Sequence, residues 1–181
     1  MKKCICLLAL WLFALAAPAQ SQHMKFMGID MNCTISTFMS KLKGKGFTED
    51  VSNHQDNKVV MKGTFAGEKV KLEVRCASKS HLVYSVMVCF NLSTSYNYET
   101  LKAQLAKYGT CQEFKNVPEG QGHVKYVTDY AQWDTDKDAE TGHTNSIVLS
   151  KCSYRSTSPY IISYIDRRNS LLDVQEVSSD F

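Results

Sequence analysis

The first half of the chain alternates apolar and polar residues in segments long enough to be strands. Residues 69–76 alternate apolar with charged side chains without exception, and residues 59–65 show a similar alternation. A period of two predicts antiparallel strands with one covered face and one face in water. Residues 82–90 are apolar at consecutive positions, which predicts a strand covered on both sides. Ile35, Phe38, Met39 and Leu42 have the spacing of one helix face.

The second half repeats this order of elements. Tyr98, Leu101, Leu105 and Tyr108 again have helical spacing, and Gly109 supplies a stop signal. Three apolar segments follow, at residues 124–133, 147–152 and 160–166. We therefore predict an α+β fold in which a helix followed by a three-stranded antiparallel sheet (α-β-β-β) occurs twice.

The predicted boundaries divide the chain into a leader and two repeats. The leader is residues 1–19, the first repeat residues 20–94, and the second repeat residues 95–181 with a C-terminal tail from residue 167. The tail is polar apart from Leu171, Leu172 and Val174, and we expect an edge segment or a loose end there.

The leader has the pattern of a secretory signal peptide. Lys2 and Lys3 precede an apolar run that is short for a membrane span, and Ala17-Pro18-Ala19 has the small-x-small pattern of a cleavage site. We expect a periplasmic or secreted protein with no membrane span after cleavage. The whole chain carries a formal charge of +3, to which the leader contributes two lysines. Without the leader the formal charge is +1, which gives no reason to expect nucleic acid or an anionic membrane as a partner.

Removal of the leader leaves an odd number of cysteines: Cys33, Cys76, Cys89, Cys111 and Cys152. In an oxidising compartment at least one of them is free, buried or bonded to another chain. A hairpin of residues 69–76 and 82–90 places Cys76 and Cys89 at opposite ends, roughly 20 Å apart, which excludes a bridge between them. Cys33, Cys89 and Cys111 are the better candidates for bridges, and buried thiols are an equally good interpretation.

An acidic insertion in the second repeat is a calcium candidate, formed by Asp134, Asp136, Asp138 and Glu140. Alternate carboxylates in a turning loop can surround this ion. The loop departs from the EF-hand pattern at Ala139, where glycine is needed, and at Asn145, where a bidentate glutamate is needed. A solvated acidic loop is the favoured interpretation, and we predict no cofactor.

No sequence motif in the chain identifies a reaction. The G-x-S-x-G, H-E-x-x-H, C-x-x-C, P-loop and dinucleotide patterns are all absent. The predicted strands are rich in aromatic residues, and tyrosine or tryptophan on an exposed sheet face suits protein binding. The predicted binding surface consists of Tyr84, Tyr126, Tyr130, Trp133 and Tyr164.

Three segments carry a resemblance to known proteins: 23–29 (HMKFMGI), 42–47 (LKGKGF) and 63–67 (GTFAG). They resemble a group of uncharacterised secreted proteins of gut Bacteroidales, a likeness that implies export and no particular activity. The tandem plan is also similar to the β-lactamase-inhibitor-protein fold and to small envelope lipoproteins of the barrel-assembly machinery. This chain lacks the lipid-anchor cysteine of those lipoproteins.

These features favour a non-catalytic binding module that holds a protein partner of the envelope on a sheet face. The alternative is a small hydrolase or carbohydrate-active protein whose site is assembled from Asp129, Asp134 and His123. A polar cleft with converging ionisable groups would favour the alternative.

Overall fold

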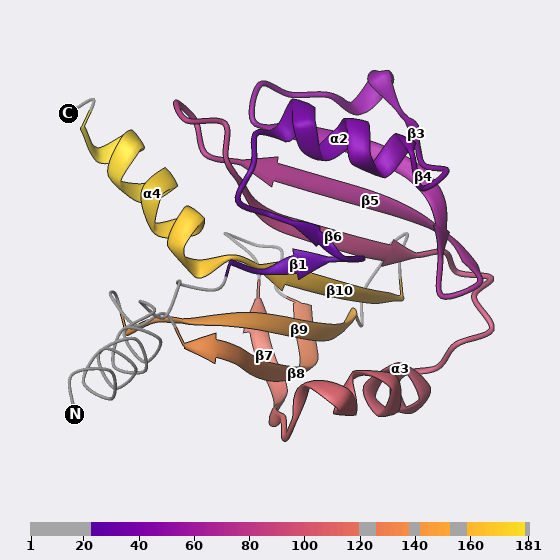
Figure 1. Cartoon of the computed structure of the whole chain (residues 1–181). Helices are drawn as coiled ribbons and strands as arrows, with labels where there is room; N and C mark the ends of the chain where they lie inside the picture. The colour runs from indigo at the N-terminus through magenta and orange to yellow at the C-terminus, as the bar shows by residue number, and fades with distance from the viewer. Residues whose placement is uncertain (1–22, 120–125, 138–141, 153–158, 180–181) are drawn as a thin grey trace, which may run out of the picture.

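A computed structural model of the protein describes residues 23–119, 126–137, 142–152 and 159–179. Most of these residues belong to one eight-stranded antiparallel sheet with the order β3-β4-β5-β6-β10-β9-β8-β7 (Figure 1). The strands of one half are β3 (Thr48–Glu49), β4 (Lys58–Phe65), β5 (Glu68–Cys76) and β6 (Val83–Phe90). Those of the other half are β7 (Gln112–Glu119), β8 (Tyr126–Lys137), β9 (Thr144–Cys152) and β10 (Tyr160–Ile165).

The two halves are joined at the centre of the sheet, where β6 pairs with β10. The register then aligns apolar residues of five adjacent strands, β5, β6, β10, β9 and β8, in rows on one face. One row is Leu72, Val88, Ile162, Leu149 and Ala131, and the next is Val74, Val86, Tyr164, Ile147 and Trp133. All of these side chains are buried, so this inner face of the sheet forms the floor of the core.

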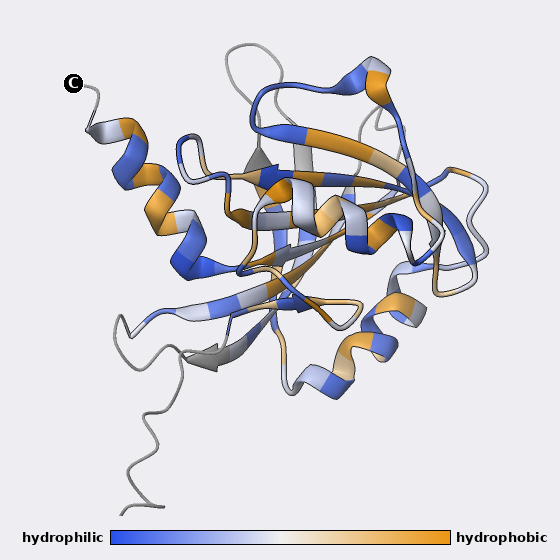
Figure 2. Ribbon diagram, turned by 45° about the horizontal axis from the view of Figure 1, so that its top comes forward, coloured by the Kyte–Doolittle hydropathy of each residue, from blue (hydrophilic) through white to orange (hydrophobic). Residues whose placement is uncertain are grey.

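Helices and a small hairpin cover the inner face. Helix α2 (Ile35–Lys43) buries Phe38 and Leu42, and α3 (Tyr98–Leu105) buries Leu101 and Leu105. The two-stranded sheet of β1 (Lys25–Phe26) and β2 (Ile29–Asp30) lies over the middle of the large sheet (Figure 1). The ring of Phe26 packs edge-on against Tyr164 with 5.1 Å between centroids. In Figure 2 the central strands are mostly hydrophobic, as this covering requires.

One close contact fixes the short edge strand β3. The ring of Phe47, just before β3, lies directly against Gly63 of β4, and a Cβ at residue 63 would come within 2.3 Å of it. Only glycine fits such an approach without a shift of the ring or of the backbone.

The prediction of a tandem α-β-β-β repeat with the architecture of the inhibitor-protein fold is wrong. The described residues form a single large sheet, a two-stranded sheet and three α-helices.

Strand β7 was not predicted, because a bulge between Phe114 and Val117 and a left-handed Asn116 interrupt its alternation. Residues assigned to a tail form α4 (Arg167–Ser178), which Asp166 caps by accepting a hydrogen bond from Asn169 N–H. Periodicity identifies single elements, whereas pairing depends on contacts between distant residues.

Several individual elements were predicted correctly. Helix α2 contains the four apolar residues whose spacing predicted it. Strands β5 and β6 form the expected hairpin, in which Cys76 faces Val83 and Cys89 faces Lys71. These two cysteines therefore lie at opposite ends of the hairpin. None of the described helices has the length and apolar composition needed to cross a membrane.

Candidate functional site

The opposite face of the sheet, here called the outer face, carries a half-buried apolar surface across β6, β10, β9, β8 and β7. Because side chains alternate along a strand, residues between those of the core rows lie on this face. One cross-strand row consists of Cys89, Ile161, Ser150, Tyr130 and Phe114. All five are half-buried. In the next row on the same face, Ser163 lies between Met87 and Val148, and Gln132 follows Val148.

No described helix lies across these rows. Helices α2 and α3 contribute to the core of the inner face. Helix α4 packs at one end of the sheet, where Asp173 and Glu176 accept hydrogen bonds from backbone N–H groups of the β5–β6 loop at residues 78–80. Within the described ranges, no helix therefore separates the outer face from a partner.

An aromatic pair marks the β7–β8 side of the outer face. The rings of Phe114 and Tyr130 stack with 4.6 Å between centroids and an angle of 19°. Stacked rings form a rigid amphipathic surface that loses little entropy on binding. Phe114 was not among the predicted site residues, because its strand was not recognised.

The five aromatic residues predicted as a binding surface do not lie together. Tyr130 is on the outer face, but Trp133 and Tyr164 are 1% and 4% exposed and belong to the core. Tyr84 is half-buried, and its pKa is raised by burial and by the nearby carboxylate of Asp173. Tyr126 begins β8, and its side chain lies outside the described part of the structure.

A polar pocket of about 400 Å³ lies at the end of the inner face, beside α3. Its lining includes Asp129 of β8, Lys151 of β9 and Tyr160 of β10, which occupy adjacent positions across the sheet. Tyr98 and Glu99 of α3 and Glu113 and Lys115 of β7 also line it. The pocket reaches the aromatic pair as well, because Phe114 and Tyr130 are among its lining residues. The volume is at the lower end of the range for small-molecule sites.

Two ionisable groups of this pocket have shifted pKa values. The carboxylate of Glu113 is hydrogen-bonded to the Lys102 ammonium, which lowers its pKa, whereas a general acid needs a raised one. Burial and the carboxylates of Glu113 and Asp129 raise the pKa of Tyr98 to about 12. Tyr98 is therefore a protonated phenol at neutral pH and can donate a hydrogen bond.

The residues proposed for an enzymatic site are not assembled by the fold. Asp129 lines the pocket and accepts a hydrogen bond from Asn116 N–H at 2.9 Å. Asp134 lies an odd number of residues along the same strand, so it projects from the opposite face, where the Gln132 side chain donates to it at 2.8 Å. His123 lies outside the described residues.

The calcium candidate falls largely outside the described structure. Asp134 is exposed, the side chain of Asp136 is not described, and residues 138–141 are outside the described ranges. In the part of the chain that can be assessed, no three His, Cys, Asp or Glu side chains are grouped as metal ligands are.

Cys33 and Cys111, two of the expected bridge candidates, have free thiols. The Cys33 Sγ donates to the carbonyl of Asp30 at 3.3 Å. Burial raises the pKa of the Cys33 and Cys76 thiols, which disfavours the nucleophilic thiolate.

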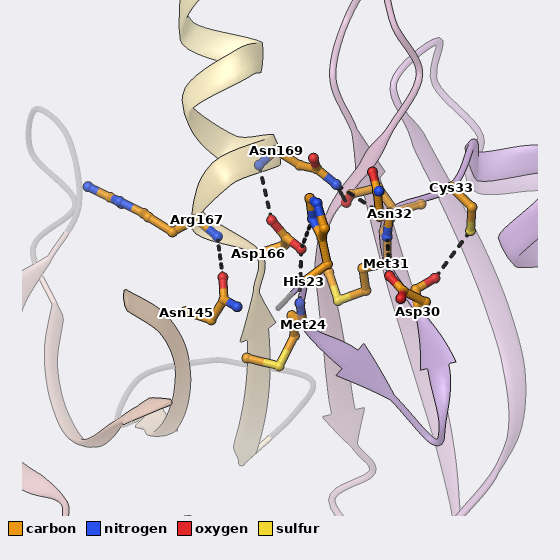
Figure 3. Close-up of polar contacts among 11 residues, drawn as sticks. His23, Met24, Asp30, Met31, Asn32, Cys33, Asn145, Asp166, Arg167 and Asn169 are labelled. Carbon is orange, nitrogen blue, oxygen red and sulfur yellow. Dashed lines mark hydrogen bonds and ion pairs between the residues drawn. The ribbon is translucent and has the colours of Figure 1, made fainter. Parts of the chain in front are cut away.

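Asp166 forms the most deeply buried polar site of the described chain, here called the Asp166 junction (Figure 3). Its carboxylate accepts hydrogen bonds from Met24 N–H and Asn169 N–H, each at 3.0 Å, and contacts His23 Nδ1 at 3.0 Å. The Asn169 side chain donates to Val83 O at 2.8 Å. The junction joins the start of the described chain to β6 and α4. Its polar groups are hydrogen-bonded to one another, so we assign it a structural role.

Comparison of the chain with protein-family models, with curated proteins and with solved structures finds no match.

Proposed function

We propose that the protein is an exported, non-catalytic binding module that holds a protein partner on its outer face. The observation that carries this proposal is the half-buried row of Cys89, Ile161, Ser150, Tyr130 and Phe114, over which no described helix packs. Methionine and aromatic residues are enriched in the cores of protein interfaces, and Met87 and the Phe114–Tyr130 pair lie on this surface.

The edges of the sheet are less suitable than its face. Edge strand β3 has only two residues, which limits pairing with an added strand. Edge strand β7 contains a bulge between Phe114 and Val117, and Pro118 removes a backbone donor. Both edges therefore have the features that block strand addition, and the face remains for docking.

Export is supported by the leader of the sequence, with its lysines, apolar run and Ala17-Pro18-Ala19 site. A partner would accordingly belong to the cell envelope or the exterior. We expect its surface to be apolar and aromatic where it meets Ile161 and Met87.

The test compares residues 20–181 as wild type, as Ile161→Glu and as Val174→Glu. Ile161 is half-buried on the outer face. Val174 is 63% exposed on α4, away from that face, so Val174→Glu is the control for introducing the same charge elsewhere. Each tagged protein is used to recover binding proteins from the envelope of the native host, and the recovered partner is then purified and titrated.

Wild type and Val174→Glu should bind the purified partner equally, and Ile161→Glu should bind at least about tenfold more weakly, because it buries a charge in the interface. Circular dichroism must show that Ile161→Glu is folded. Equal binding by all three proteins, or recovery of no stoichiometric partner, would contradict the proposal.

A second candidate function is binding of a hydroxyl-rich small ligand, such as a saccharide, in the polar pocket. Asp129 and Lys151 are direct cross-strand partners of opposite charge, and a sugar hydroxyl can donate to one and accept from the other. Tyr98 and Tyr160 both line the pocket and pack against the core, so they present ring surface there. Loss of saccharide binding in Asp129→Asn, with Ile161→Glu unaffected, would assign that activity to the pocket.

A further inference from the structure

A groove of about 460 Å³ lies at the β3–β5 side of the sheet, away from the aromatic pair. The side chains that define its chemistry are Thr48, Lys62, Thr64, Lys69, Lys71 and Asn91, and we call it the lysine groove. None of the described residues that line it is acidic.

The strand register brings the lysines together. Lys62 of β4 is directly opposite Lys71 of β5, and Thr64 is directly opposite Lys69. Lys69 and Lys71 are two residues apart on one strand, so their Cα atoms are roughly 6.7 Å apart and their side chains share a face. Like charges directly opposite each other destabilise a sheet.

Protection of a sheet edge does not account for this arrangement. Lysines do occur on edge strands, where they discourage pairing with another chain. Lys69 and Lys71, however, belong to β5, which is hydrogen-bonded to β4 on one side and to β6 on the other. These two lysines therefore belong to an interior strand of the sheet and do not protect an edge.

The lysine charges are only partly compensated. Lys62 Nζ is 2.9 Å from Asp50 Oδ2, but neither Lys69 nor Lys71 has a carboxylate within 4 Å among the described residues. The nearest acids along β5 have other partners: Glu73 pairs with Arg75, and Glu68 accepts from Ser95. Two exposed ammonium groups therefore remain available to an anion.

The groove is built on rigid backbone. Phe47 packs against Gly63 from the inner face, which fixes β4 beneath the groove. The Asn91 side chain donates to Lys69 O at 3.0 Å, and the Thr48 hydroxyl contacts Lys62 O at 3.4 Å. The Thr64 hydroxyl, opposite Lys69, adds a further hydrogen-bonding group.

We propose that the lysine groove binds the phosphate or sulfate group of a soluble ester. Ammonium and hydroxyl donors around one site match the oxygens of such a group. The volume exceeds that of a single tetrahedral anion and leaves room for the organic part of the ligand. Lys71 is directly opposite Cys89 at the end of the row around Ile161, but no residue of that row lines the groove. The proposal therefore does not depend on the protein-binding function.

Binding is measured by calorimetry on residues 20–181 at low ionic strength, where charge interactions are least screened. The probes are glucose 6-phosphate, glucose 6-sulfate, neutral glucose, inorganic phosphate and vesicles containing phosphatidylglycerol. The variant is Lys69→Gln/Lys71→Gln, and the control is Lys107→Gln, which removes an exposed lysine near α3.

We expect each glucose ester to bind Lys107→Gln with the same affinity as wild type. Each ester should bind the double variant at least tenfold more weakly than wild type. Glucose should not bind. Equal ester binding by the double variant, binding of vesicles without esters, or binding of inorganic phosphate as tight as that of the esters would each overturn the proposal. Failure of the esters to bind wild type would do so as well.

A second measurement separates a binding role from a stabilising one. Lys71→Gln removes the repulsion with Lys62, so its melting temperature without ligand should rise by about 1–3 °C. Saturating glucose 6-phosphate should raise the melting temperature of wild type but not of the double variant. A fall in melting temperature for Lys71→Gln without ligand would show that the lysine is kept for stability, which contradicts the proposal.

Discussion

At the scale of single residues, Asp166 has the greatest structural consequence. Its fully buried carboxylate accepts from Met24 N–H and Asn169 N–H and contacts His23. Replacement by alanine leaves these groups buried without their acceptor, and we expect Asp166→Ala to lower the free energy of unfolding by about 3 kcal/mol. Urea denaturation measures this change. Asp56→Ala, at an exposed turn, is the control and should change it by less than about 0.5 kcal/mol. A cost for Asp166→Ala as small as that of the control would show that another group replaces the carboxylate.

At the scale of elements, the attachment of α4 depends on pH. The side chain of Ser80 and the N–H groups of Lys79 and Ser80 face the Glu176 carboxylate and lower its pKa. A lowered pKa in the folded state stabilises the protein above the ordinary pKa of glutamate, and this contribution is lost as the pH falls through the folded value. Wild type should therefore melt higher than Glu176→Gln at neutral pH, and the difference should shrink at about pH 3.

Melting curves of both proteins at the two pH values provide the measurement, with Asp56→Asn as the control for loss of an exposed carboxylate. A difference between wild type and Glu176→Gln that stays constant with pH would show that the charge of Glu176 does not hold α4.

A helix or strand could be predicted from the sequence where its own residues carry a regular apolar pattern. Strand β5 alternates without exception, so its faces were assigned correctly, and α2 followed from four apolar positions. Strand β7 was missed because its bulge breaks the alternation. Helix α4 was missed because it has no continuous apolar face. Its N-cap, Asp166, was a local signal that could have revealed it.

At the scale of the whole molecule, the pairing of β6 with β10 decides the architecture, and no local pattern encodes it. The outer face is a row only because five strands meet in one register. The polar pocket likewise needs Asp129, Lys151 and Tyr160 from three strands. Tyr130 could be selected from the sequence, but its neighbours Ile161 and Phe114 could not. For the same reason the burial of Trp133 was not anticipated.

The small hairpin β1–β2 is part of the core of the whole molecule. It contributes Phe26 and Ile29, and Met24 precedes it; all three side chains are buried. A protein that begins at Met31 loses this apolar burial, which we expect to cost about 5 kcal/mol or more. Its thermal transition should be broad or absent, whereas a protein beginning at His23 should melt like residues 20–181. A cooperative transition of the shortened protein near that of the longer one would contradict this role.

The Asp166 junction also has a consequence for the order of events during synthesis and export. The bonds to Met24 and His23 link residues 142 and 143 positions apart in the chain. A chain that crosses a membrane with its amino end first, as the leader predicts, cannot close its core until its last strand and final helix have emerged. Until then β6 has an exposed, apolar hydrogen-bonding edge, which is prone to pair with other chains. This risk lasts from the emergence of β6 to that of β10, the interval in which a holding chaperone on the far side of the membrane would protect the chain.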